Sequence, residues 1–226
     1  MKHINIAIDG PSGAGKSTLA RLLAQELQFI YVDTGAMYRA VGLYMARAGL
    51  KNHDVEGIVR LLPCVRIELR YENGMQEIFL NGENVSRAIR TEEASRWASD
   101  VSAIPQVRAF LLDAQRDMAK KGNVIMDGRD IGTVVLPEAD VKIFLTASSE
   151  DRARRRYEEL REKGEDVVYE DVLRHLLERD AQDSGRKTAP LRAADDAILM
   201  NTTGNTLEQS LGALRAVIKE KTKHVV

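Results

Sequence analysis

The stretch IAIDGPSGAGKSTLA, residues 6–20, passes from an apolar run into glycines and then into a lysine and two hydroxyl side chains. Residues 10–17 match the pattern G-x-x-x-x-G-K-[ST]. Glycines let backbone N–H groups turn toward an anion, and the helix that follows adds the positive end of its dipole. The stretch therefore predicts a strand, a phosphate-binding loop and a helix, and with them a nucleotide-binding protein.

One hydroxyl and one carboxylate, those of Ser17 and Asp127, extend this prediction to a metal ion. Lys16 is expected to reach the β- and γ-phosphates of the nucleotide, and Ser17 to offer its hydroxyl to Mg²⁺. Asp127 ends a second apolar run, NVIMD (123–127), where such proteins place the carboxylate that holds Mg²⁺ directly or through water. We therefore expect ATP and Mg²⁺ as cofactors, with Ser17 and Asp127 at the metal and with Lys16 and Asp127 acting in catalysis.

The bulk composition is that of an ordinary globular protein. The 226 residues are 44% hydrophobic and 30% charged, and 33 basic residues nearly balance 34 acidic ones. No global field then favours nucleic acid or an anionic membrane, so we expect neither as a partner. Cys64 is the only cysteine, which excludes an internal disulfide and a zinc site of several cysteines. With no signal-peptide pattern and no apolar run near the ~18 residues of a membrane span, a cytoplasmic monomer is expected.

Apolar runs alternate with helical patterns along most of the chain, which favours a doubly wound α/β fold. Runs without strict alternation are typical of buried parallel strands. The predicted strands are residues 4–9, 29–33, 123–127, 141–147 and 197–202. The predicted helices are residues 17–28, 34–48, 105–120, 149–163, 169–180 and 207–223.

Two segments depart from this rhythm. Residues 64–85 alternate with period two around an Asn73-Gly74 step, which predicts a small antiparallel hairpin. Residues 148–166 form a charge-dense helix. The four arginines between residues 152 and 156 have two interpretations: a solvated face paired with Glu158, Glu159 and Glu162, or a mobile lid that closes over ATP. These arginines are Arg152, Arg154, Arg155 and Arg156.

The remaining arginines indicate transfer of a phosphoryl group rather than a regulatory switch. The chain has no Asn-Lys-x-Asp or Thr-Lys-x-Asp element of a guanine switch, and no Leu-Ser-Gly-Gly-Gln signature of a transport ATPase. Transfer to an anionic acceptor needs a second cationic pocket, and the planar guanidinium group suits the charge of the transition state. Arg39, Arg129, Arg179 and Arg186 follow predicted strands or lie near helix ends. Arg129, at the carboxyl edge of the sheet, is the strongest candidate.

Four motifs together resemble the bacterial cytidylate kinase family of nucleoside monophosphate kinases. They are DGPSGAGKST (9–18), VDTGAMYRA (32–40), DGRDIGTVV (127–135) and ERDAQDSGR (178–186). The resemblance runs from about residue 4 to about residue 220 and implies transfer of the γ-phosphate of ATP to CMP or dCMP. It implies a single P-loop kinase domain (1–226) whose parallel five-stranded core sheet is flanked by helices. A nucleoside monophosphate-binding insertion (34–104) and a short helical lid (150–167) would complete the domain.

The same resemblance assigns roles to individual positions. Thr34, Arg39 and Arg129 would contact the acceptor phosphate, and Ser99, Arg108 and Asp130 would contact the cytosine. Arg179 and Asp183 would contact the sugar, and Arg186 would lie near the transferring phosphate. Arg129 and Arg186 would be catalytic. The donor nucleotide would lie on Gly10, Pro11, Ser12, Gly13, Ala14, Gly15, Lys16, Ser17 and Thr18, with Arg155 from the lid. Cytosine offers an exocyclic amine to a carboxylate or hydroxyl, whereas uracil places an acceptor oxygen there.

Two alternatives remain at this point. One is a P-loop kinase for another small acceptor, such as UMP or shikimate, which predicts a different partner for Asp130. The other is a nucleotide-binding regulator that holds RNA, which the balanced charge and the lack of aromatics among the arginines disfavour. The order of preference among CMP, dCMP and UMP, the extent of lid closure and any role of Cys64 are left open by the sequence.

Overall fold

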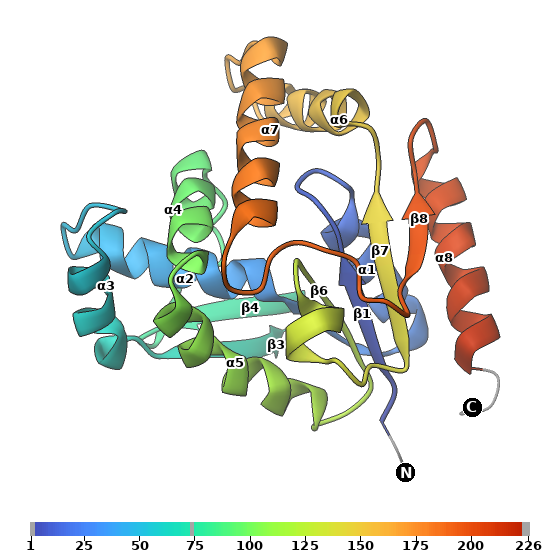
Figure 1. Ribbon diagram of the computed structural model, residues 1–226, viewed down its shortest axis with the longest axis horizontal. Helices are drawn as coiled ribbons and strands as arrows, with labels where there is room; N and C mark the ends of the chain where they lie inside the picture. The colour runs from blue at the N-terminus through green and yellow to red at the C-terminus, as the bar shows by residue number, and fades with distance from the viewer. Residues whose placement is uncertain (1–2, 73–74, 223–226) are drawn as a thin grey trace.

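A computed structural model of the chain describes residues 3–72 and 75–222 and has a five-stranded sheet at its centre (Figure 1). The strands are β1 (Asn5–Asp9), β2 (Ile30–Asp33), β6 (Val124–Gly128), β7 (Val141–Thr146) and β8 (Ile198–Asn201). They pair in the order β2-β6-β1-β7-β8, and every pair is parallel. The predicted parallel five-stranded sheet is confirmed.

Helices cover both faces of this sheet, as the unbroken apolar runs of its strands require. Successive side chains of β1 point to opposite faces. Ile6 and Ile8 pack with α1 (Lys16–Leu27) and α8 (Leu207–Thr222) on one face. Ala7 packs on the other face with residues of α5 (Pro105–Ala119) and of a π-helical turn, η2 (Ile131–Val135).

The chain between β2 and α5 forms a second, smaller layer. Its elements are α2 (Thr34–Arg47), α3 (Val55–Leu61), the 3₁₀ turn η1 (Leu62–Cys64), β3 (Ile67–Glu72), β4 (Met75–Leu80), β5 (Glu83–Asn84) and α4 (Glu92–Ser102). β3, β4 and β5 pair antiparallel, and Glu72 pairs with Met75 across the hairpin. The predicted hairpin is confirmed and has a third short strand; its Asn73-Gly74 step lies outside the described residues.

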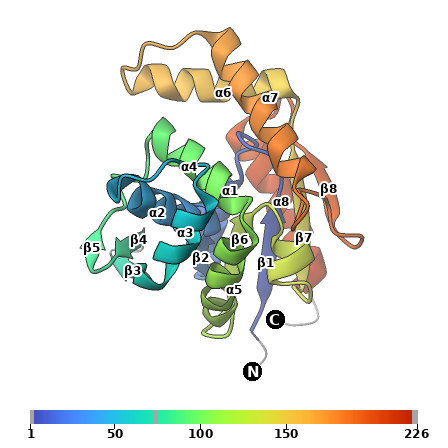
Figure 2. The ribbon, with the colours of Figure 1, turned by 60° about the vertical axis from the view of Figure 1, so that its left-hand side comes forward.

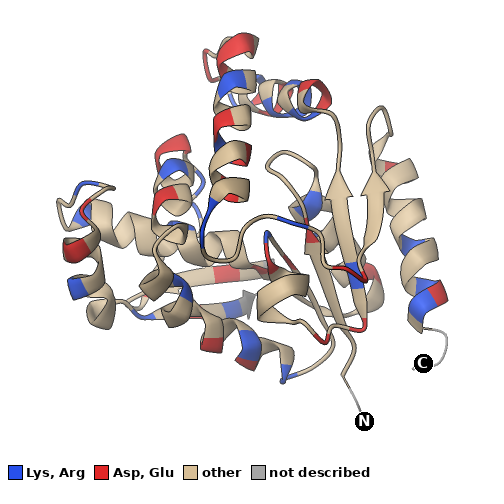
Figure 3. Ribbon diagram, viewed as in Figure 1, with Lys and Arg blue, Asp and Glu red and all other residues tan. Residues whose placement is uncertain are grey.

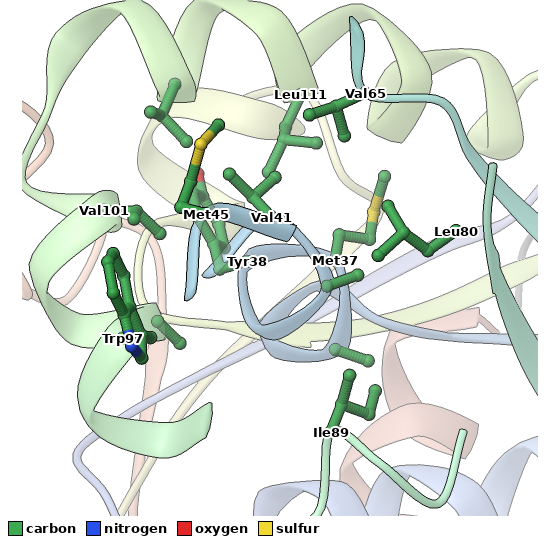
Figure 4. Close-up of a cluster of buried hydrophobic side chains, with 14 of the residues drawn as sticks. Met37, Tyr38, Val41, Met45, Val65, Leu80, Ile89, Trp97, Val101 and Leu111 are labelled. Carbon is green, nitrogen blue, oxygen red and sulfur yellow. The ribbon is translucent and has the colours of Figure 1, made fainter. Parts of the chain in front are cut away.

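This layer has an apolar core of its own (Figure 4). Met37, Val41 and Met45 of α2 pack there with Trp97 of α4 and with residues of β4 and α5. α2 and α4 approach closely because residue 42 is glycine: a Cβ atom there would lie 2.5 Å from Cβ of Trp97. The core fixes where α2 and α4 present their polar ends toward the central sheet.

Two further helices lie beyond the carboxyl end of β7 (Figures 1 and 2). α6 (Ser149–Glu162) begins after Ser148, whose hydroxyl accepts a hydrogen bond from the amide of Asp151 at 3.2 Å. α7 (Tyr169–Gly185) runs five residues beyond the predicted end at residue 180. α3 and α4 were not among the predicted helices, although the stretch around Ser99 has a helical pattern. Within the described ranges, no helix combines the length and apolarity that crossing a membrane requires.

Candidate active site

The loop between β1 and α1 has the backbone that the glycine pattern predicts. Gly10 has φ of +146°, and a Cβ atom on it would lie 1.9 Å from the carbonyl oxygen of Leu145 in β7. Gly13 and Gly15 also have positive φ, 73° and 85°, and Gly15 is the N-cap of α1. Only glycine is compatible with the first of these positions. The predicted strand, loop and helix are present, with the loop at the carboxyl edge of the sheet.

Lys16 lies buried at the start of α1, and its Nζ donates to the carbonyl oxygen of Pro11 at 2.6 Å. Burial, together with the positive charge of Arg129, holds the pKa of Lys16 well below its ordinary value. Two cationic side chains therefore approach each other beside the loop. An anion placed there would relieve this repulsion, as a phosphate would.

Asp127 lies at the carboxyl end of β6 and bonds two hydroxyl groups. Ser17 Oγ donates to one carboxylate oxygen at 2.8 Å, and Tyr31 OH donates to the other at 2.9 Å. Sheet register pairs Asp33 with Asp127, so burial and then repulsion from Asp33 raise the pKa of Asp127 to about 6. The carboxylate and the Ser17 hydroxyl are the hard oxygen ligands that Mg²⁺ prefers, and a cation there would offset the crowded negative charge.

The described part of the chain holds no group of three His, Cys, Asp or Glu side chains that would bind a metal ion alone. Mg²⁺ typically keeps several waters and is held by one or two carboxylates plus substrate phosphates. The donor set of Ser17 and Asp127 fits that mode of binding. Tyr31 was not predicted, because it reaches Asp127 through the pairing of β2 with β6 rather than through a motif.

Asp9, the last residue of β1, supports the segment that carries two candidate site residues. Its carboxylate accepts hydrogen bonds from the amides of Ile131 at 2.8 Å and Gly132 at 2.7 Å. These bonds hold the first turn of η2 against β1 and so fix Arg129 and Asp130 just before it. Burial raises the pKa of Asp9 to about 6, in spite of the two backbone hydrogen bonds. Sequence reasoning missed this role; the only signal was a polar residue at the end of a buried strand.

Three arginines, Arg129, Arg179 and Arg186, surround Asp183 and are called the arginine group below. Arg129 Nε donates to Asp183 at 2.8 Å, and Arg186 approaches it at 3.6 Å. Burial and then the charge of Arg129 lower the pKa of Arg179 to about 10. Among the described residues, Nε of Arg179 and Nε of Arg186 are buried without a hydrogen-bond partner. Buried donors normally have acceptors, so this arrangement suits an anionic ligand.

Asp183 is 3% exposed and is the acidic centre of the arginine group. Burial alone would raise its pKa, but the three arginines outweigh that effect and hold the pKa below its ordinary value. One carboxylate therefore neutralises only part of the surrounding positive charge. The surplus makes this side of the site an anion-binding region.

Ser99, Arg108 and Asp130, the three residues predicted to contact cytosine, are connected in the structure. Arg108 and Asp130 form a buried ion pair, and Arg108 also donates to the carbonyl oxygen of Ser102 at 3.1 Å. Ser102 Oγ donates to the carbonyl oxygen of Ser99 at 2.9 Å and accepts from Arg186 at 3.1 Å. Ser102 was not predicted, and it joins the cytosine trio to the arginine group.

The buried guanidinium of Arg108 has a second supporting contact. It lies 5.5 Å from the centre of the Tyr38 ring. Burial alone would lower the pKa of Arg108, but Tyr38 and Asp130 outweigh it, so the pKa lies above its ordinary value. Arg108 is therefore held as a fixed cation beside Asp130.

Thr34 and Arg39 lie at the start of α2, next to the carboxyl end of β2. Thr34 Oγ1 donates to the carbonyl oxygen of Asp127 at 2.8 Å, so its proton is already used. Gly128 makes this approach possible, since a Cβ atom on it would lie 2.7 Å from Thr34 Oγ1. Arg39 pairs with Asp33, the N-cap of α2, at 2.7 Å. Both residues reach the predicted site but bond to the protein itself here.

The arginines of α6 differ from one another, and neither sequence interpretation covers all of them. Arg152 is buried and donates to the carbonyl oxygen of Ser12 at 2.7 Å and to Asp180 at 2.6 Å. It therefore supports the phosphate-binding loop, a role that was not predicted. Arg154, by contrast, is exposed.

Arg155 lies beside the loop: its Nη1 is 4.0 Å from where a Cβ atom on Gly15 would be. It pairs with Asp151 at 2.6 Å. Arg156 pairs with Glu159 one turn along α6 and with Glu92 of α4. Figure 3 shows acidic and basic residues interspersed along α6 and α7.

Comparison with known proteins identifies the family. Residues 6–220 match the family described as Cytidylate kinase. A Cytidylate kinase of Caldicellulosiruptor saccharolyticus is 51% identical, with 93% of each chain covered. That of Carboxydothermus hydrogenoformans is 52% identical over 96% of this chain and 98% of its own. That of Flavobacterium johnsoniae is 45% identical over 99% of each chain. An uncharacterized protein from Eubacterium ventriosum shares the fold, with a TM-score of 0.54 at 13% identity over 97% of this chain and 99% of that one.

These matches span nearly the whole chain and agree with the geometry of the phosphate-binding loop and of the two charged regions beside it. They also favour a cytidylate kinase over the alternatives, because the matched family is described as Cytidylate kinase and not as a shikimate kinase or an RNA-binding regulator. The chain belongs to the cytidylate kinase family.

Proposed function

We propose that this enzyme of the cytidylate kinase family transfers the γ-phosphate of ATP to CMP or dCMP by holding the two nucleotides in two adjoining anion pockets. The donor pocket is the loop from Gly10 to Thr18 with Arg155 beside it. The acceptor pocket consists of Thr34, Arg39, the arginine group, Asp183 and the trio of Ser99, Arg108 and Asp130. The buried donors of Arg179 and Arg186 that lack partners among the described residues are the observation that best supports an anionic acceptor.

In the donor pocket, the loop amides and Lys16 would bind the phosphates of ATP. Lys16 now donates to Pro11, and exchanging that carbonyl for a β- or γ-phosphate oxygen forms a charge-assisted hydrogen bond. Ser17 and Asp127 would hold Mg²⁺, which when bound neutralises charge on the phosphate oxygens. Tyr31 would keep the Asp127 carboxylate oriented through its hydrogen bond.

In the acceptor pocket, Thr34, Arg39 and Arg129 would bind the acceptor phosphate and bring it in line with the donor. Arg129 lies between the two pockets, since it influences the pKa of Lys16 and donates to Asp183. Arg186 would stabilise the transferring group, and Asp183 with Arg179 would contact the sugar. The acceptor phosphate is already an oxyanion, so no general base is needed. Catalysis is then positioning plus stabilisation of charge in the transition state.

The trio would distinguish cytosine from uracil by the direction of its hydrogen bonds. Asp130 accepts from the exocyclic amine, and Arg108 donates to the ring nitrogen and the carbonyl oxygen. Uracil places an oxygen opposite the Asp130 carboxylate and leaves the buried groups without suitable partners. Hydrogen-bond recognition of this kind gives a larger ratio of kcat/KM between two substrates than a difference in shape alone.

An ADP-release assay with ATP, Mg²⁺ and a panel of acceptors tests the proposal. The panel contains CMP, dCMP, UMP, AMP, GMP and shikimate. We expect turnover with CMP and dCMP well above the rate without acceptor, and weaker turnover with UMP. Turnover of CMP and dCMP no faster than the rate without acceptor would overturn the proposal.

The variant Asp130→Asn tests the acceptor pocket within the same assay. The amide keeps the shape of the side chain but turns a donor toward the cytosine amine or toward Arg108. We expect kcat/KM for CMP to fall by about 10²-fold, on the order of a lost charged hydrogen bond at a specificity site. Asp113→Asn, an exposed change on α5, is the matched control and should leave kcat/KM unchanged.

A further inference from the structure

A hydrogen-bonded chain of four side chains ends at Ser99, one of the proposed cytosine contacts. Ser99 Oγ donates to Oε1 of Gln182 in α7 at 2.8 Å. Gln182 Nε2 donates to Oδ1 of Asp100 at 3.4 Å. Asn52 Nδ2 donates to the other Asp100 oxygen at 2.5 Å. These hydrogen bonds therefore run from α4 to α7, back to α4, and on to the loop between α2 and α3.

The chemistry of these four side chains fixes which group donates and which accepts in each hydrogen bond. An ionised carboxylate accepts hydrogen bonds and donates none, so the NH₂ group of Gln182 must face Asp100. The amide oxygen of Gln182 then faces Ser99 and accepts its only proton. The Ser99 hydroxyl is left with lone pairs alone to offer elsewhere, and Ser99 itself is buried, at 7% exposure.

We propose that Gln182 is a positioning residue that sets the specificity of the enzyme, by holding the Ser99 hydroxyl as an acceptor toward the pyrimidine. This inference rests on the proposed placement of Ser99 beside the base. The exocyclic amine of cytosine has two protons, and Asp130 and Ser99 supply the two acceptors. The oxygen of uracil at that position meets two acceptors and is rejected. Without Gln182, the Ser99 hydroxyl rotates and donates to that oxygen.

The test measures kcat/KM for CMP and for UMP and compares their ratio among variants. Gln182→Leu removes the acceptor and keeps most of the side-chain volume. We expect it to lower the CMP-to-UMP ratio about fivefold to tenfold, the size of one hydrogen bond, chiefly through faster turnover of UMP. Ser184→Ala, an exposed change on the same helix, is the matched control for alterations of α7.

A double-variant cycle shows whether Gln182 acts through Ser99. In a Ser99→Ala background no hydroxyl is left to orient, so Gln182→Leu should change the ratio by less than about twofold, the usual limit of independent behaviour. An equal drop in both backgrounds would overturn the inference. If Ser99→Ala lowers the ratio and Gln182→Leu does not, the inference fails while the acceptor pocket stands. If Ser99→Ala itself leaves the ratio unchanged, the placement of Ser99 in the proposed function fails.

An exchange of donor and acceptor gives a rescue that packing alone does not predict. The double variant Asp100→Asn with Gln182→Glu keeps the total charge and lets residue 100 donate to residue 182. The carboxylate at 182 still accepts from Ser99, so we expect the CMP-to-UMP ratio to stay within about twofold of the parent. A ratio as low as that of Gln182→Leu would contradict the role of the acceptor.

Discussion

The two pockets of the site are built in different ways. The donor pocket is made of backbone from one continuous stretch, residues 10–18, shaped by glycines with positive φ. The acceptor pocket is made of side chains from α2, α4, α5, α7 and the segment after β6, and its charged groups pair with one another. A preformed backbone cradle needs little rearrangement to bind phosphate, whereas the acceptor pocket must exchange internal ion pairs for contacts to its nucleotide.

The largest expected effect comes from Lys16, the cationic side chain within the donor loop. Lys16→Met keeps the length and apolar stem of the side chain but removes its charge. We expect kcat to fall by roughly 10²–10³-fold, the usual loss for one preorganised donor to a transition state, with the fold preserved. Steady-state kinetics measure this loss. Lys120→Met, on the exposed lysine that caps the C-terminus of α5, should leave kcat unchanged, and a similar loss there would contradict the account.

The acceptor pocket should respond differently, because its charges depend on one another. Asp183→Asn removes the acid that Arg129 bonds and leaves buried positive charge without compensation. We expect it to lower the free energy of unfolding by about 3–5 kcal/mol. Inorganic phosphate should then raise the melting temperature of this variant more than that of the parent.

Thermal unfolding with and without phosphate measures both effects of Asp183→Asn. Asp195→Asn, an exposed change in the loop before β8, is the control. Equal phosphate shifts in the variant and the parent would show that the arginine group is not an anion site whose positive charge Asp183 partly neutralises. Such a result would remove the contrast between the two pockets.

A smaller effect is expected at Asp9, which joins the two pockets through η2. Its pKa is about 6 in the fold against 3.8 as the ordinary value, so the folded state takes up the proton more readily. Stability from this group is present at low pH and is lost as pH rises from about 4 through about 6. The difference in unfolding free energy between parent and Asp9→Asn should therefore shift against the parent by at most roughly 2–3 kcal/mol over that range.

Chemical denaturation of the parent and of Asp9→Asn at pH 4 and pH 7 checks this expectation. Asp113→Asn, on the surface of α5, should show no such shift relative to the parent. A stability difference between the parent and Asp9→Asn that does not change with pH would contradict the account of Asp9 as a buried support for η2.

The same contrast explains what the sequence could predict. The donor loop and the five buried strands follow from contiguous patterns, and all of these elements are present. Tyr31 and Asp9 were missed because their partners, Asp127 and the amides of η2, come near them only through strand pairing and chain reversal. Gln182 was missed because α7 continues five residues beyond its predicted end. Side chains that act by bonding another side chain leave no spacing rule in the sequence.

The arginines show a similar limit. Charge density along α6 did not distinguish Arg152, which supports the loop at Ser12, from the exposed Arg154. The difference depends on which helical face packs toward Asp180 in α7. That face is decided by the packing of α6 against α7, and therefore by tertiary structure rather than by local pattern.

A crystal structure with CMP and a non-hydrolysable ATP analogue bound together tests the central claim most directly. The account predicts the pyrimidine amine about 3 Å from an Asp130 oxygen and from Ser99 Oγ, the usual distance of a hydrogen bond. It also predicts the CMP phosphate beside Thr34, Arg39 and Arg129, facing the terminal phosphate at Lys16, with Arg186 near the transferring group. A pyrimidine bound away from Arg108 and Asp130, or a CMP phosphate away from Arg39 and Arg129, would contradict it.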